Sequence, residues 1–354
     1  MEEKTDIKSF NKEELRSVIG ELGEKKFRAD QMYDWMHVKL ARSFDEMTNI
    51  SKDFREKCKE KFFYTAVEPV TVQESKLDGT RKFLFALDDG NVVESVLMRY
   101  KHGNSVCISS QVGCRMGCRF CASTLDGLTR NLRPSEMLDQ IYAISRLIGE
   151  RISNVVVMGT GEPLDNYDNL LKFIRLLTDE NGLHISQRNV TVSTCGIVPN
   201  IYRLADEKLQ ITLALSLHGA TDVKRQELMP IAKAYSIDEL MQAVDYYFEK
   251  TGRRITFEYS LVAGVNDTKE DVDNLTRLAA PRNCHINLIP VNPIKERDYR
   301  QPKQEYVTAF KNKLEKNRIN VTIRREMGRD IDGACGQLRK RYMGEKNITE
   351  RQES

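Results

Sequence analysis

The sequence has one tryptophan, five histidines and no apolar run near the roughly 20 residues that a membrane-spanning helix needs. Its first ten residues, MEEKTDIKSF, lack the basic and apolar regions of a secretory signal peptide. These absences argue against a membrane protein and predict a cytoplasmic one, in which thiols stay reduced. The eight cysteines are therefore predicted to serve a metal or catalysis rather than structural disulfides.

There is also little net charge, only +3, but it is unevenly placed. Residues 1–100 hold 18 Lys and Arg against 20 Asp and Glu, and the remainder holds 37 against 32. Basic clusters occur at 129–133 (TRNLR), 323–329 (IRREMGR) and 338–346 (LRKRYMGEK). Each cluster is typical of a solvated surface, and together they hint only weakly at a phosphate-bearing partner.

The chain divides into two regions that differ in the spacing of their apolar residues. Residues 10–62 carry apolar positions at helical spacing, and two β-rich runs follow, joined by the turn signal DDG at 88–90. We interpret residues 1–100 as a small α+β accessory domain, 101–343 as the core with its C-terminal segment, and 344–354 as a flexible tail.

Within the core, short apolar runs alternate with amphipathic helical segments. The runs are SVCISSQ (105–111), NVVVMG (154–159), NVTVST (189–194), ITLALSL (211–217), ITFEYSLV (255–262) and HINLIPV (285–291). This alternation predicts an α/β fold with a parallel sheet, and six units are too few for a closed eight-stranded barrel. A partial (βα)6 barrel or an open sheet fits, with ligands at the carboxyl ends of the strands.

The first core strand leads into GCRMGCRFC, which places Cys114, Cys118 and Cys121 in the spacing C-x3-C-x2-C. A structural zinc site would need a fourth ligand, yet no second pair follows and the next cysteine is Cys195. Three thiolates suit a [4Fe–4S] cluster that keeps one iron open for a substrate. Zinc and unliganded thiols remain the alternatives.

Further motifs follow the other strands, and together they carry a resemblance. The segments are SSQVGC, TRNL, GEPLDN, STCGIVP, SLH, LIPVNP and DIDGACGQL, with KKFRADQMYDWM at 25–36. The cysteine spacing followed by GEP is similar to the radical S-adenosylmethionine superfamily. The whole set resembles the RlmN family of RNA adenine methyltransferases from about residue 80 to 340, and residues 25–36 resemble its N-terminal domain.

The resemblance implies methylation of adenine at C2. This carbon is electrophilic, so it cannot attack the sulfonium methyl group of S-adenosylmethionine directly. The resemblance also implies a [4Fe–4S] cluster held by Cys114, Cys118 and Cys121, and two molecules of S-adenosylmethionine, one of which is cleaved by one electron. By the same resemblance Cys335 carries the methyl group, Cys107 forms a transient disulfide with it, and Glu94 accepts a proton.

Carried over as contacts to S-adenosylmethionine are Gly161, Glu162, Ser193, Ser216, Leu217, His218 and Asn292. Without the family, Glu94 would be expected on the solvent face of its strand, Cys107 as a buried strand cysteine and His218 as a core histidine. Cys195 and Cys284 belong to no assigned motif.

The partners that the resemblance implies are 23S ribosomal RNA or its assembly intermediate, tRNA, and an electron donor such as flavodoxin. The resemblance also implies that residues 1–100 bind RNA, and we expect the protein to be a monomer. Two alternatives stay open. A Cfr-type enzyme would modify C8 of adenine and confer antibiotic resistance, but GEPLDN and CASTLDGLTRNL look like RlmN. A non-catalytic iron–sulfur RNA-binding protein would not need Cys335, Cys107 or the GEP segment.

Overall fold

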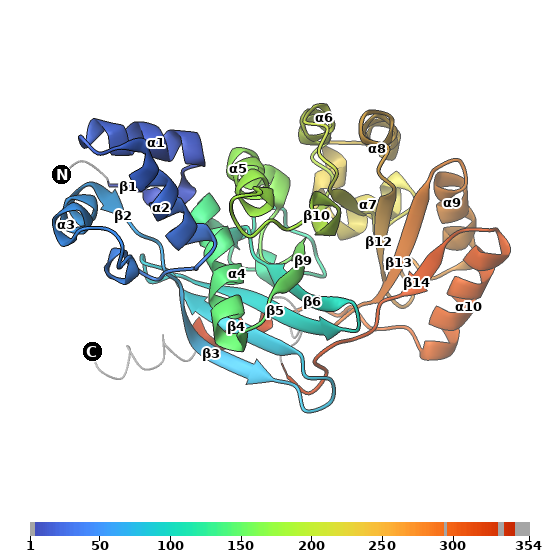
Figure 1. Ribbon diagram of the computed structural model, residues 1–354. Coiled ribbons are helices and arrows are strands. Elements are labelled where there is room, and N and C mark those ends of the chain that lie inside the picture. Colours follow the sequence, from blue (N-terminus) through green and yellow to red (C-terminus); the bar gives the residue numbers. More distant parts are fainter. Residues whose placement is uncertain (1–3, 294–295, 332–335, 344–354) are drawn as a thin grey trace.

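The computed structural model describes residues 4–293, 296–331 and 336–343. Within these ranges a ten-stranded sheet has the order β14-β13-β12-β11-β10-β9-β6-β5-β4-β3 (Figure 1). Its strands are β3 (Glu68–Glu74), β4 (Arg81–Ala86), β5 (Val92–Tyr100), β6 (Gly103–Ile108), β9 (Ile152–Val157), β10 (Val190–Thr194), β11 (Thr212–Ser216), β12 (Ile255–Leu261), β13 (Cys284–Pro290) and β14 (Val321–Ile323). Two short pairs join β1 (Thr5–Asp6) to β2 (Phe62–Phe63) and β7 (Gln111–Gly113) to β8 (Leu128–Asn131).

From β6 to β14 the strands are parallel and alternate with helices, so the predicted α/β partial barrel is confirmed. The helices of the chain are α1 (Lys12–Glu21), α2 (Lys26–His37), α3 (Lys52–Lys61), α4 (Pro134–Ile148), α5 (Tyr167–Thr178), α6 (Val198–Asp206), α7 (Asp222–Leu228), α8 (Ile237–Thr251), α9 (Lys269–Ala279) and α10 (Gln304–Lys316). None of those described has the length and apolar character to cross a membrane. The sequence pattern misses β14, because three residues make too short a run to recognise.

Local sequence explains why these units form. In β10, Val190 and Val192 are fully buried and β-branched, which suits a strand covered by helices. Helix α4, which contacts β6, begins at Pro134, whose fixed φ suits the first helical turn. It ends at Gly149, which has a φ of 65° that a residue with a side chain rarely adopts.

The antiparallel strands β3, β4 and β5 extend the same sheet beyond β6. The expected hairpin is present: β4 and β5 pair in register across a turn at 88–90 that contains Gly90 at a φ of 79°. The predicted domain boundary at residue 100 therefore falls between two hydrogen-bonded strands. The division into domains stays a prediction.

The helices α1, α2 and α3 lie beside α4 at one end of the sheet (Figure 1). Polar groups join the two regions, and we call Asp6, Lys8, Thr65, Ser135 and Asp139 the N-terminal junction. The Lys8 ammonium lies 2.8 Å from Asp139 Oδ1, and the Val67 N–H donates to Asp139 Oδ2 at 2.6 Å. The Thr65 and Ser135 hydroxyls donate to Asp6 Oδ2. Each buried group thus has a partner, as buried polar groups need.

Candidate active site

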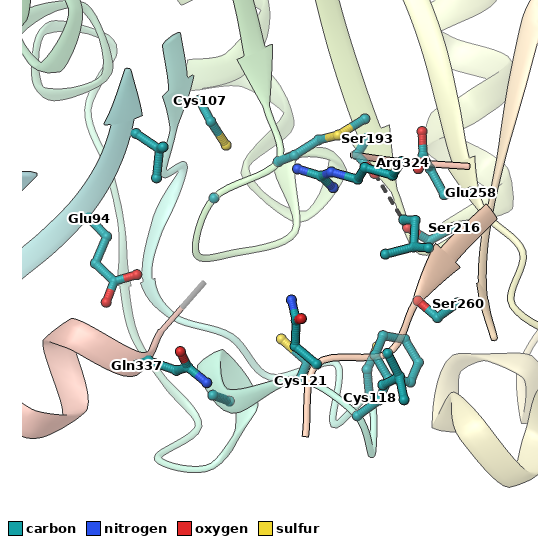
Figure 2. Close-up of a pocket in the computed structure, with 18 of the residues that line it drawn as sticks. Glu94, Cys107, Cys118, Cys121, Ser193, Ser216, Glu258, Ser260, Arg324 and Gln337 are labelled. Atoms are coloured by element: carbon teal, nitrogen blue, oxygen red, sulfur yellow. Dashed lines mark hydrogen bonds between the residues drawn. The ribbon is translucent and has the colours of Figure 1, made fainter. Parts of the chain in front are cut away.

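A cavity of about 810 Å³ lies at the carboxyl ends of the parallel strands. Its size is in the range of sites that enclose a cofactor or a drug-sized ligand. Residues predicted for the site that line it are Glu94, Cys107, Cys114, Cys118, Cys121, Gly161, Glu162, Ser193, Ser216, His218 and Asn292. Figure 2 shows Glu94 and Cys107 on one side and Ser216, Glu258 and Ser260 on the other. Cys335 lies outside the described residues.

The cysteine loop is held by its own backbone. The Cys114 N–H donates to Gly127 O at 2.8 Å, and the Thr124 hydroxyl donates to the carbonyls of Cys118 and Cys121. A Cβ on Gly113 would lie 2.0 Å from Gly127 O, so this close approach requires glycine. The loop is therefore fixed without help from a bound group.

The three thiols are buried or half-buried, and burial raises the pKa of each. For Cys114 the value rises to about 12, with Cys121 and Glu162 adding to the effect of burial. The described residues include no group of three or more His, Cys, Asp or Glu placed to share one metal ion. In a cubane cluster each thiolate binds a different iron, so the loop suits a cluster better than a single zinc ion.

A second observation supports the fit of a negatively charged group. Arg225 of α7 is fully buried, and its Nη2 donates to the Cys195 carbonyl at 2.5 Å. Its Nε and Nη1 have no hydrogen-bond partner among the described residues. The Cys195 and Cys118 thiols, whose own pKa values are raised by burial, are close enough for a charge on either to act on the guanidinium group. A buried charge without a partner is costly, and an anionic group held by the loop would supply one.

The segment after β9 brings Gly161 and Glu162 to the same place. A Cβ on Gly161, at a φ of 113°, would lie 2.7 Å from the Gln111 side chain, so the close approach again needs glycine. Glu162 accepts hydrogen bonds from the Cys195 N–H at 2.7 Å and the Leu164 N–H at 3.0 Å. Burial raises its pKa, these two bonds hold the carboxyl group in place, and Glu162 lines the cavity.

The ends of β10 and β11 contribute polar groups on the opposite wall. The hydroxyls of Ser193 and Ser216 are 3.3 Å apart. His218, at a φ of 53°, accepts a hydrogen bond at Nδ1 from the Ser260 N–H (2.9 Å). Burial, aided by Arg225, lowers the pKa of His218 to about 3, so the ring is neutral and its proton is on Nε2. Leu217 is fully buried and its N–H donates to the Glu258 carbonyl.

On the other wall, Glu94 faces the buried side of β5, so the expectation from strand alternation alone was wrong. Its carboxylate lies 3.0 Å from the Lys82 ammonium and accepts hydrogen bonds from the N–H groups of Gly336 and Arg339, each at 2.6 Å. It therefore caps the helical residues 337–343. Lys82 was not predicted, although a lysine inside the apolar run RKFLFAL was its signal.

Cys107, on β6 beside β5, lines the cavity as well. Burial raises the pKa of its thiol, and Arg324 opposes that effect. Arg324 and Glu258 also line the cavity without having been predicted. Burial raises the pKa of Glu258, which accepts a hydrogen bond from Asn287 Nδ2 at 2.8 Å. Cys284 is remote from this wall and donates to Ala279 O from the start of β13.

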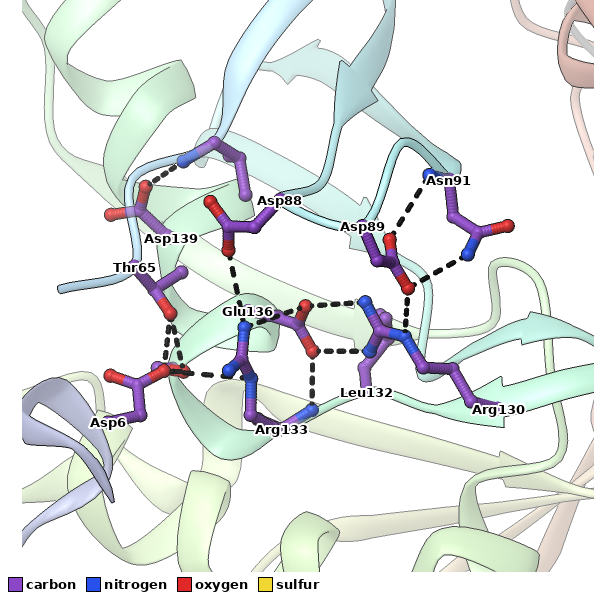
Figure 3. Close-up of polar contacts among 12 residues, drawn as sticks. Asp6, Thr65, Asp88, Asp89, Asn91, Arg130, Leu132, Arg133, Glu136 and Asp139 are labelled. Atoms are coloured by element: carbon purple, nitrogen blue, oxygen red, sulfur yellow. Dashed lines mark hydrogen bonds and ion pairs between the residues drawn. The ribbon is translucent and has the colours of Figure 1, made fainter. Parts of the chain in front are cut away.

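The basic cluster at 129–133 does not present free charge (Figure 3). Arg130 lies 2.6 Å from Asp89 and 2.8 Å from Glu136, and Arg133 lies 3.3 Å from Asp88. Carboxylates of the same chain neutralise these guanidinium groups, so this cluster no longer supports the expectation of a phosphate-bearing partner.

The chain is similar to known proteins over almost its whole length. Residues 5–63 match the model of the ribosomal RNA large subunit methyltransferase N-terminal domain, and residues 108–279 match the radical SAM superfamily. A probable dual-specificity RNA methyltransferase RlmN from Lachnospira eligens is 70% identical over 96% of this chain and 97% of its own. A protein of the same name from Lachnoclostridium phytofermentans is 61% identical over 98% of both chains. The crystal structure of a radical SAM methyltransferase from Sphaerobacter thermophilus, 40% identical, covers 94% of this chain and 98% of its own with a TM-score of 0.90.

Proposed function

The chain belongs to the RlmN family of radical SAM dual-specificity RNA methyltransferases, and from this premise we propose that it methylates C2 of adenosine in 23S ribosomal RNA and in tRNA. The observation that carries the proposal is the 70% identity over 96% of the chain. The gathering of the predicted side chains around one cavity supports it. A base reaches such a cavity when it is splayed out of a loop.

Cys114, Cys118 and Cys121 would hold a [4Fe–4S] cluster with one iron open, one cluster per chain. Radical SAM membership implies this cluster and S-adenosylmethionine. When bound, the pair supplies one-electron cleavage of a sulfonium, a chemistry that side chains lack. Because burial raises their pKa values, the thiols carry their protons in the absence of a metal and would release them when the metal binds.

The remaining walls would orient S-adenosylmethionine. Glu162, fixed by its bonds to Cys195 and Leu164, offers a carboxylate to the methionyl ammonium group, close to Gly161. The hydroxyls of Ser193 and Ser216 would bind the carboxylate and the ribose. The Leu217 backbone, neutral His218 and Asn292 would contact the ribose and adenine.

The methyl carrier would be Cys335, which lies outside the described residues. Glu94 would accept the proton that adenine C2 loses. Radical addition leaves one unpaired electron on the adduct, which a one-electron acceptor must take up. Cys107 would then attack the Cys335 sulfur as a thiolate, forming the S–S bond while the bond from Cys335 to the methylene carbon breaks. The methylene carbon keeps the electron pair of that bond and takes up a proton to become the methyl group. The product leaves, and the disulfide must be reduced by a thiol or protein reductant before the next cycle.

We also propose flavodoxin as the electron donor, a monomeric enzyme, and the cytoplasm as the compartment, because the family's RNA substrates are there. Residues 5–63, the part that matches the N-terminal methyltransferase model, would contact RNA.

The regiochemistry is tested by digesting RNA methylated in vitro and comparing its nucleosides with standards by chromatography and mass. A dominant 2-methyladenosine peak is expected. A dominant 8-methyladenosine peak would overturn the proposal and place the enzyme with the Cfr type.

The role of Cys107 is tested separately. Cys107→Ala should accumulate a protein–RNA adduct that survives denaturing gels, because the thiolate that releases the product is missing. Cys107→Ala combined with Cys335→Ala should show no adduct, since the carrier is absent. Normal turnover by Cys107→Ala would refute the assignment.

A further inference from the structure

Arg225 occupies a place that the fold makes specially for it. A Cβ on Gly219 would lie 2.7 Å from the Arg225 backbone nitrogen, so a glycine lets α7 approach the end of β11. A Cβ on Gly196, at a φ of 99°, would lie 3.0 Å from Arg225 Nη2. Two glycines therefore leave room for one guanidinium group beneath the strand ends.

The guanidinium group is tied to the site through one peptide. Its Nη2 donates to the Cys195 carbonyl, and the N–H of the same residue donates to Glu162. The loop is in contact with α7 as well, because the Arg119 N–H donates to the Leu228 carbonyl at 2.9 Å. Arg225 thus lies next to the cysteine loop on one side and to the predicted ammonium ligand Glu162 on the other.

The charge of Arg225 is not balanced by the described residues. No carboxylate among them forms an ion pair with it, and Nε and Nη1 have no hydrogen-bond partner there. Asp222, on the same helix, opposes the lowering of the Arg225 pKa by burial but forms no ion pair with it. A buried charge without a counter-charge is costly, so a chain would be expected to retain such a cation only where an anion completes it.

We propose that Arg225 is the buried counter-charge of the iron–sulfur cluster, facing the sulfur of Cys118 and raising the reduction potential of the cluster. The inference rests on the proposed function for the identity of the cluster. Reduction adds one negative charge to a group already held by three thiolates. A cation in a buried, water-poor position favours that added charge, and hydrogen bonds to cluster sulfurs act in the same direction.

The test is an anaerobic redox titration of the reconstituted protein, followed by electron paramagnetic resonance of the reduced cluster. Arg225→Gln, which removes the charge and keeps an amide donor, should lower the reduced-to-oxidised ratio at a fixed potential about tenfold, which equals about 59 mV. Arg225→Lys keeps the charge and should stay close to wild type. Arg203→Gln, the same substitution on an exposed side chain of α6, is the matched control and should not move the ratio.

An unchanged potential in Arg225→Gln would overturn the proposal, as would an equal shift in Arg225→Lys and Arg225→Gln. If Arg225→Gln does not fold, Arg225→Met takes its place. Unfolding adds a second readout: cluster loading should raise the thermal midpoint more in wild type than in the charge-free variant, whereas equal increments would contradict the proposal. Failure of the proposed function would appear instead as wild-type protein that makes no methyladenosine while its potential still depends on Arg225.

Discussion

Lys8 and Arg225 are both fully buried cations, and they differ in what surrounds them. Lys8, in the N-terminal junction, lies 2.8 Å from Asp139 and 4.5 Å from the centre of the Tyr64 ring. Arg225, on α7 beside the Cys195 peptide, has one carbonyl as its partner and no ion pair among the described residues. Burial lowers the pKa of both, but only Lys8 has a nearby carboxylate that opposes the effect strongly.

The different surroundings of the two cations indicate what the buried charges of each region do. The junction is complete within the chain, so its buried charges serve the fold. Radical SAM membership implies that a cluster and S-adenosylmethionine bind this chain, so we expect the unpaired charge of Arg225 to serve a bound group at some cost in stability. Substitutions in the two regions should therefore fail in different ways.

The largest effect is expected for the cluster cysteines. Cys118→Ala removes one of the three proposed iron ligands, so iron and sulfide content and cleavage of S-adenosylmethionine should be lost, while the apoprotein keeps the fold. Cys284→Ala is the matched control, because this thiol lies at the start of β13 and donates to Ala279 O. Iron and sulfide analysis measures cluster content, and circular dichroism checks the fold. A Cys118→Ala protein with wild-type iron content would contradict the proposed role of this cysteine.

At the junction the reverse is expected. Asp139→Asn leaves the Lys8 ammonium buried without its counter-charge, so the free energy of unfolding should fall by roughly 3–5 kcal/mol. Urea denaturation of the apoprotein measures this loss. Where the variant stays folded, iron binding should be retained. A change below 1 kcal/mol would show that the ion pair contributes little.

A smaller effect concerns pH. Burial lowers the pKa of His37, near the junction, to about 3 from the usual 6.5. The unfolded chain therefore binds a proton below about pH 6.5 that the folded protein does not, and stability from this group is present above that pH and falls below it. The loss is at most about 1.4 kcal/mol per pH unit. His37→Gln should reduce the difference in unfolding free energy between pH 7 and 5; an identical difference would refute the assignment.

The smallest effect sharpens the comparison by moving the same chemistry to the surface. Asp273 pairs with Lys269 at 2.8 Å on the exposed side of α9. Asp273→Asn should change the free energy of unfolding by less than about 0.5 kcal/mol, because water solvates both charges. Urea denaturation of this variant and of Asp139→Asn, side by side, provides the measurement. If the two variants lose the same free energy of unfolding, burial does not explain the effect of Asp139→Asn.

Particular residues show how far sequence reasoning reached. The cysteine loop, the GEP segment and the serines were predicted in one site because each follows a strand, and parallel strands end at one edge of a sheet. Glu94 was placed correctly by the family resemblance and wrongly by alternation. Lys82 and Arg225 were missed. A lysine inside an apolar run was a signal for Lys82, but nothing in the spacing of the short helix α7 marks Arg225.

The sequence by itself determined the family and most of the alternation of strands and helices, and it predicts the ligands of the cysteine loop, since periodicity, turn residues and motif spacing are local properties. Only the tertiary structure decided which charges are paired. Lys8 and Asp139 are 131 positions apart, and Arg225 meets the carbonyl of Cys195 across 30. Local pattern cannot report such contacts, because a buried charge is balanced by whatever the fold brings within a few ångströms of it.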